Sequence, residues 1–181
     1  MVWAIVAIVV VVILVGAALW ARARRTRQLQ SRFGPEYGRV VEQFGDHHAA
    51  EQELRERTKR REKLSISPLT SEEREVFSSR WNATQARFVD QPATAVDSAD
   101  RLIADVMRTR GYPVETFEQQ AADVSVDHPQ VVAEYRAGHA IAEANGNQQA
   151  STEDLRQAMV HYRALFESLV TETNEHAEEA R

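Results

Sequence analysis

The chain alternates between apolar and polar stretches, and the first stretch differs from all the others. Residues Val2 to Trp20 form a run of 19 residues without a charged side chain. As a helix rising about 1.5 Å per residue, the run would span roughly 28 Å, close to the bilayer hydrocarbon thickness of about 30 Å. Ten of these residues are Val or Ile, and in lipid such a run is forced into a helix because the backbone must satisfy its own hydrogen bonds. The pattern predicts a transmembrane anchor over residues 1–21.

The residues that flank the apolar run predict how the anchor is oriented. Tryptophans at both ends are typical of membrane interfaces, and basic residues that follow a span keep their side in the cytoplasm. The predicted interface residues are Trp3, Trp20, Arg22, Arg24, Arg25 and Arg27. We therefore expect a single-pass protein of the cell membrane, with its N-terminus outside and its C-terminal domain in the cytoplasm.

Two other interpretations of this junction are weaker. A cleaved export signal has a positive region before a shorter apolar core, whereas here the arginines follow the run. A basic arm for nucleic acid fits poorly with the acidic remainder of the chain. A third possibility keeps the anchor but places the domain on the outer side of the membrane.

Residues 22–68 predict a basic juxtamembrane segment followed by a charged helical neck. "FGPEYGR" should end the first helix, since Gly34 and Pro35 mark a stop and a start, and a short helix should follow over 35–44. Residues 46–63 carry acid-first pairs four residues apart, such as Glu51 with Arg55. A helix that is polar nearly all round usually bridges solvent, so we expect a stalk.

Residues 69–172 predict a compact all-α bundle, followed by a polar tail over 173–181. Apolar residues recur at helical spacing between clear start and stop signals. Thr70 with Glu73 and Ser151 with Asp154 resemble capping boxes, Gly111 should end a helix, and Asp127 or His128 should cap a helix that begins at Pro129. The expected helices cover 71–90, 92–110, 114–122, 129–144 and 152–172.

The charge distribution and the composition argue against some classes of partner and chemistry. Residues 21–63 hold 12 basic and 7 acidic side chains, whereas residues 64–181 hold 10 basic and 20 acidic ones. An acidic domain argues against nucleic acid as the partner, because such binding rests on neutralising phosphates. The arginines of residues 22–32 should instead attract anionic lipid. With no cysteine in the chain, disulfides and thiolate chemistry are excluded.

The chain contains few residues that suggest chemistry. His47, His48 and Glu51 have helical spacing for a metal pair, but a solvated charged face explains them better, and we expect no metal and no cofactor. The weak catalytic candidates lie on the apolar faces of two helices and would form an acid–base pocket if those helices were neighbours; they are His139, His161, Tyr135 and Tyr162. Core residues with one satisfied hydrogen bond are the more common outcome.

Four strings carry a family resemblance: "RFGPEYGR", "TQARFVDQPATAVDSADRLIADVMRTRGYP", "DVSVDHPQVVAEYRAGHAIA" and "STEDLRQAMVHYRALFESLV". Together they resemble an uncharacterised family of bacterial, largely actinobacterial, single-pass membrane proteins over most of residues 31–170. The resemblance implies a membrane-anchored helical protein and no activity. We therefore expect a cytoplasmic scaffold that binds another protein, and the alternative is a membrane-anchored enzyme with an unfamiliar His/Tyr pocket.

Overall fold

The structure, a computed structural model, describes residues 2–171, apart from the side chains of residues 2 and 4–11. The described residues form eight α-helices and no strand, which confirms the all-α prediction. The chain divides into two compact units, one up to Arg55 and the other from Glu56, and each is described by itself below.

The first unit contains three helical segments, as the sequence predicts. Helix α1 covers Val2–Phe33 and α2 covers Pro35–Phe44, with Gly34 between them. Helix α3, His47–Glu62, begins in this unit, and the Asp46 carboxylate caps it by accepting a hydrogen bond from the Ala49 backbone N–H at 2.9 Å. Within α2, Tyr37 and Val40 are buried, whereas Phe44 is exposed.

For this unit, the main prediction is that residues 1–21 form a transmembrane anchor. Among the residues that the structure describes, no helix has both the length and the apolar character that a membrane span needs. Ten of the 21 side chains of the predicted anchor, those of residues 1, 2 and 4–11, lie outside the described part of the chain.

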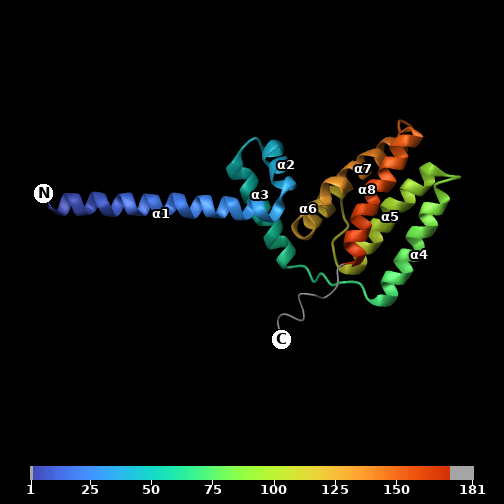
Figure 1. The fold of residues 1–181 in the computed structure, drawn as a ribbon, viewed down its shortest axis with the longest axis horizontal. Coiled ribbons are helices and arrows are strands. Elements are labelled where there is room, and N and C mark those ends of the chain that lie inside the picture. The colour runs from blue at the N-terminus through green and yellow to red at the C-terminus, as the bar shows by residue number, and fades with distance from the viewer. Residues whose placement is uncertain (1, 172–181) are drawn as a thin grey trace. The chain divides into compact units, whose positions relative to one another are not determined.

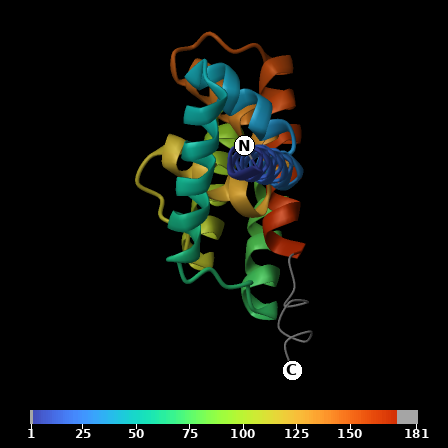
Figure 2. The same ribbon diagram turned by 90° about the vertical axis from the view of Figure 1, so that its left-hand side faces the viewer.

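The second unit is a bundle of four longer helices with a shorter one beside them. In Figure 1, α4 and α5 form an antiparallel pair, α8 packs against α5, α7 packs against α8, and α6 lies next to α7. Figure 2 shows α8 running along the height of this bundle, with the loop from α7 at its upper end. The helices are α4 Ser71–Arg87, α5 Pro92–Arg110, α6 Phe117–Asp127, α7 Val132–Gly146 and α8 Thr152–Thr171.

The core of this unit lies on the helix faces that the apolar spacing predicts. Helix α8 is central, and its predicted stripe from Leu155 to Val170 is buried along its whole length. Trp81 of α4 stacks on Phe166 of α8 with ring centroids 4.7 Å apart. Val76 of α4 is an exception among the apolar residues at helical spacing, because it is exposed.

The boundaries of three helices, α4, α6 and α7, differ from the prediction. Helix α4 ends at Arg87 rather than residue 90, and a turn covers the next three residues. Helix α6 starts at Phe117, where the Thr116 hydroxyl accepts from the Gln119 N–H, and it extends to Asp127. Helix α7 therefore cannot begin at Pro129; the backbone N–H groups of Val131 and Val132 both donate to the carbonyl of His128, which makes a turn there.

Candidate functional site

Asp100 of α5 joins two of the sequence-predicted candidates in one cluster. Its Oδ1 atom accepts a hydrogen bond from the Tyr162 hydroxyl at 2.7 Å and lies 3.2 Å from Nδ1 of His139. Tyr162 comes from α8 and His139 from α7, so one carboxylate connects three helices. We call Asp100, His139 and Tyr162 the Asp100 cluster.

Tyr135 lies beside this cluster and has a separate partner. Its hydroxyl donates to the side-chain carbonyl of Gln120, on α6, at 2.7 Å, and both residues are buried. The Tyr135 and Tyr162 rings are 6.3 Å apart. Phe117 stacks on the His139 ring with centroids 3.6 Å apart and planes 8° from parallel. The imidazole is therefore fixed by a ring on its face and a carboxylate at its edge.

The electrostatics of the Asp100 cluster favour an ionised carboxylate and protonated phenols. Burial raises the pKa of Asp100, but the contacts with His139 and Tyr162 outweigh it, and the pKa lies below its usual value. Burial, reinforced by the negative charge of Asp100, raises the pKa of Tyr162 and of Tyr135 far above normal. Both tyrosines therefore act as hydrogen-bond donors at neutral pH, because neither forms a phenolate.

His161, the fourth candidate, has a different partner. Its Nδ1 atom makes a close contact with the carboxylate of Glu134, on the neighbouring helix α7. Gly138 allows α7 and α8 to approach here, since a Cβ atom at this position would lie 3.3 Å from the Cβ of His161 and from the Tyr162 ring. The condition that the sequence analysis set for a shared pocket is therefore met, because the helices bearing the two histidines are neighbours, but the histidines contact different carboxylates.

The sequence analysis missed four partners of its candidate residues, namely Asp100, Phe117, Gln120 and Glu134. A signal for Asp100 was present, because the spacing of Val96, Ala99 and Ile103 puts residue 100 on the core-facing stripe of α5. A carboxylate at such a position needs a buried partner. Nothing in the sequence indicates that the partners would be His139 and Tyr162.

The remaining sequence-predicted candidates have structural partners. Glu51 is buried and accepts hydrogen bonds from the Thr26 hydroxyl at 2.6 Å and the Arg55 guanidinium at 3.0 Å, which differs from the solvated face that we expected. Tyr37 lies between Glu51 and His47, 3.4 Å from each. Across the described residues, no group of three His, Cys, Asp or Glu side chains is placed to hold a metal ion.

The segment "VDHP" holds the bundle together instead of capping a helix start. His128 is buried, and its Nδ1 atom lies 2.8 Å from the Ser168 hydroxyl. Asp127, at the end of α6, accepts from the Tyr112 hydroxyl at 2.6 Å and pairs closely with Arg61. The prediction of a cap at Asp127 or His128 is therefore wrong, because tertiary partners use both side chains.

A basic pocket of about 410 Å³ lies within the first unit, between α1 and the start of α3. Its lining includes Arg22 and Arg25, which the sequence placed at the membrane interface, together with His48 and Arg55 of α3. Of the two predicted interface tryptophans, Trp20 has the Arg24 guanidinium over its ring at 5.5 Å. Trp3 is exposed.

The arrangement of the His/Tyr residues is better suited to fixing helices than to chemistry. The hydroxyls of Tyr135 and Tyr162 are both engaged and held in their protonated form. A histidine oriented by a carboxylate can act as a base, and His139 retains this ability because its side chain is partly exposed.

Comparison with protein-family models, with curated proteins and with solved structures found no match to this chain.

Proposed function

We propose that this is a single-pass membrane protein whose helical bundle lies on the cytoplasmic side and binds another protein as a scaffold. The observation that carries the proposal is the surface of α1. Its large apolar side chains between Val12 and Trp20 are exposed, and they continue the uncharged run that begins at Val2. Large exposed apolar surfaces mark sites of contact with a membrane or another protein.

The residues that follow this apolar surface support its placement at a lipid interface. Arg22 and Arg25 face a pocket that His48 and Arg55 complete, so positive charge gathers where the apolar stretch ends. Arginines in such a place attract anionic headgroups, with a gain of about 1 kcal/mol each near the surface. Anionic lipid is therefore the partner that we propose for residues 22–32.

The scaffold role is supported by how the polar residues of the bundle are used. Asp100, Tyr135 and Tyr162 are engaged with neighbouring helices, and they stabilise the interior. The bundle thus presents its outer face to other molecules. Membership of the actinobacterial family that the sequence resembles stays a prediction, and it implies only a membrane-anchored helical protein.

Membrane anchoring can be tested by alkaline carbonate extraction of membranes from cells that make the full chain. We expect the wild type to stay in the pellet and the double variant Val12→Lys, Ile13→Lys to be released, because each lysine at a span centre costs about 3 kcal/mol on insertion scales. The matched control is Val12→Leu, Ile13→Leu, which should stay in the pellet. Release of the wild type under these conditions would rule out the anchor.

The orientation and the partner need separate measurements. A reporter that is active only outside the cytoplasm, fused after residue 181, should be silent, and its activity would place the bundle on the outer side. Cross-linking in intact cells, followed by purification of the full chain, should recover one reproducible protein partner. Recovery of the chain alone in repeated experiments would contradict the scaffold role.

The alternative, an enzyme, is favoured by one contact, that between His139 and Asp100. A carboxylate that orients an imidazole is a common arrangement for general bases, and His139 is accessible enough to meet a substrate. A panel of ester and phosphoester substrates tests this function with the purified full chain. Turnover that His139→Gln abolishes and His161→Gln retains would support the enzyme, and absence of turnover across the panel would leave the scaffold.

A further inference from the structure

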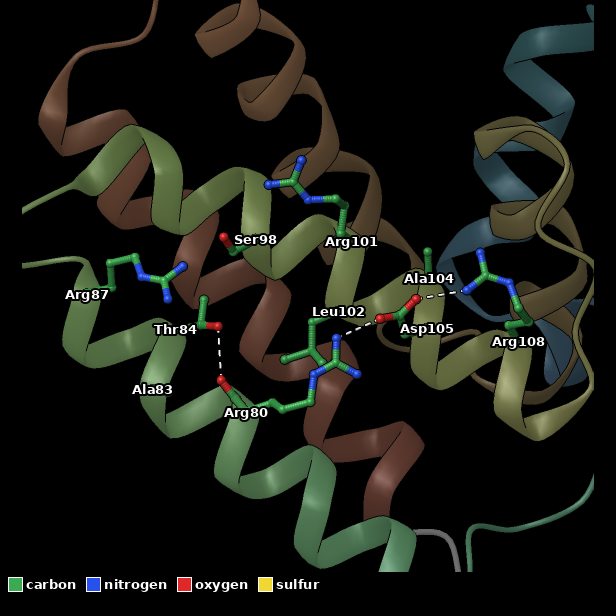
Figure 3. A pocket seen from close by; sticks show the side chains of 10 residues that line it. All are labelled: Arg80, Ala83, Thr84, Arg87, Ser98, Arg101, Leu102, Ala104, Asp105 and Arg108. Carbon is green, nitrogen blue, oxygen red and sulfur yellow. Dashed lines mark hydrogen bonds and ion pairs between the residues drawn. The ribbon is translucent and has the colours of Figure 1, made fainter.

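The outer face of the α4–α5 pair carries a groove of about 530 Å³ that arginines dominate. Figure 3 shows the guanidinium groups spread along the two helices rather than gathered at one point. The groove is lined by four arginines and one acid, with a buried leucine between the helices: Arg80, Arg87, Arg101, Arg108, Asp105 and Leu102. We call this feature the arginine groove. It is a local excess of positive charge on a domain that is otherwise acidic.

The arginines of the groove repeat with the same spacing on both helices. Arg80 and Arg87 are seven residues apart on α4, and Arg101 and Arg108 are seven residues apart on α5. Seven residues correspond to two helical turns, or about 10.5 Å along the axis. Each helix therefore contributes two cations to one face, separated by two turns.

Half of this positive charge is available to a ligand. Asp105 already pairs with Arg80 at 2.6 Å and with Arg108 at 2.8 Å. Arg87 and Arg101 are exposed, and among the residues that the structure describes neither guanidinium group has an ion pair or a hydrogen bond. A guanidinium binds carboxylates through two parallel hydrogen bonds, and it is less strongly hydrated than an ammonium group.

The shape of the arginine groove favours an elongated ligand. Small side chains, those of Ala83, Ser98 and Ala104, line it between the arginines, so another backbone can come close to both helices. A compact anion such as a single phosphate would reach only part of an array that extends over two turns. An α-helix with acidic residues three, four and seven positions apart presents its carboxylates over the same length.

We propose that the arginine groove is the docking site for an acidic helix of a partner protein. The proposal rests on the proposed scaffold function and names the partner chemistry. Carboxylates of the partner helix pair with Arg87 and Arg101, and its remaining acids compete with Asp105 for Arg80 and Arg108. Charge complementarity of this kind selects the partner and speeds association.

The test measures binding of a fluorescent helical peptide to the purified full chain in a non-ionic detergent. The probe is an alanine-based peptide of about 17 residues, with glutamates spaced to form one acidic face, and the control probe has glutamine at the same positions. The protein variant is Arg87→Gln, Arg101→Gln. The control variant is Arg163→Gln, which removes an exposed arginine of α8 outside the groove.

We expect the glutamate peptide to bind the wild type and Arg163→Gln equally, and the double variant at least about tenfold more weakly, which corresponds to losing about 1.4 kcal/mol. Affinity should also fall as salt is raised, because exposed charges are screened. All these arginines are exposed, so equal thermal unfolding of the variants will show that folding is intact.

Three outcomes would overturn the docking site. These are equal affinity of the double variant and the wild type, equal binding of the glutamine peptide, and tighter binding of tripolyphosphate than of the peptide, which would indicate a small-anion site. None of these results bears on carbonate extraction or on cross-linking to a partner in cells. Failure of the groove can therefore be distinguished from failure of the scaffold function.

Discussion

At the scale of single residues, Asp100 connects three helices through its side chain. One carboxylate oxygen contacts both Tyr162 and His139, and ionisation is favoured although burial opposes it. A folded-state pKa below the unfolded value, about 3.9, gives stability that is fully present above that value and is lost as pH falls through the folded pKa. The protein should therefore lose stability on acidification, in part because Asp100 becomes protonated.

Two tyrosine variants distinguish the loss of a hydrogen bond to the charged Asp100 carboxylate from the loss of a hydrogen bond to a neutral group. Tyr162 and Tyr135 are buried. Tyr162→Phe and Tyr135→Phe each remove one hydroxyl that donates to a side chain of another helix, and each should cost about 1–3 kcal/mol at neutral pH. Only Tyr162→Phe removes a donor to Asp100, so its urea stability should depend less on pH below about pH 5. Tyr135→Phe, whose partner is the Gln120 amide, is the matched control. Equal pH dependence of the two variants would show that Tyr162 does not stabilise the Asp100 carboxylate.

At the scale of elements, the helix ends show most clearly how local sequence directs structure. The Thr70 and Glu73 capping box is formed, with Glu73 N–H donating to the Thr70 hydroxyl at 3.2 Å. Ser151 and Asp154 make the same reciprocal contacts. These ends were predicted correctly because the hydrogen bonds involve residues only three positions apart.

At the end of α5, glycine is required both by the local backbone conformation and by a close approach of another segment of the chain. Gly111 has φ of 99°, which favours glycine, and a Cβ atom there would overlap the backbone carbonyl of Ser65. Gly111→Ala should destabilise the protein by about 1–3 kcal/mol, because the strain and the overlap add. Gly146→Ala, at the end of α7 with nothing within 4 Å of the new methyl group, should change the free energy of unfolding by less than about 1 kcal/mol. Urea denaturation measures the free energy of unfolding of both variants. If Gly111→Ala destabilised the protein as little as Gly146→Ala, this role of Gly111 would be contradicted.

At the scale of the whole molecule, the second unit extends further towards the N-terminus than its apolar pattern suggests. Arg57 is buried and its guanidinium lies 3.4 Å from the Ser125 hydroxyl, whereas Arg61 pairs with Asp127. The charged end of α3 thus packs on α6 in place of the free stalk that we expected. The reason is that α6 presents acidic and hydroxyl side chains that match the arginines.

Two fragments test where the second unit begins. A fragment of residues 56–171 retains these arginines and the hydrogen bond from Ser67 N–H to the Arg110 carbonyl, whereas a fragment of residues 69–171 lacks both. We expect the longer fragment to unfold cooperatively and at a higher urea concentration. Its free energy of unfolding should be larger by about 1–3 kcal/mol or more, because side chains of α6 lose their arginine partners in the shorter fragment. Circular dichroism during urea unfolding checks this, and equal midpoints would place the start of the unit after residue 68.

The sequence by itself determined the helical class, most helix boundaries and the buried stripe of α8, because helix periodicity and capping depend on residues a few positions apart. Only the tertiary structure decided that the helices of His139 and His161 are neighbours, and which residues the two histidines contact. Asp100 meets Tyr162 across 62 positions, and Arg61 meets Asp127 across 66. Such pairs arise when helices pack, and no local pattern encodes them.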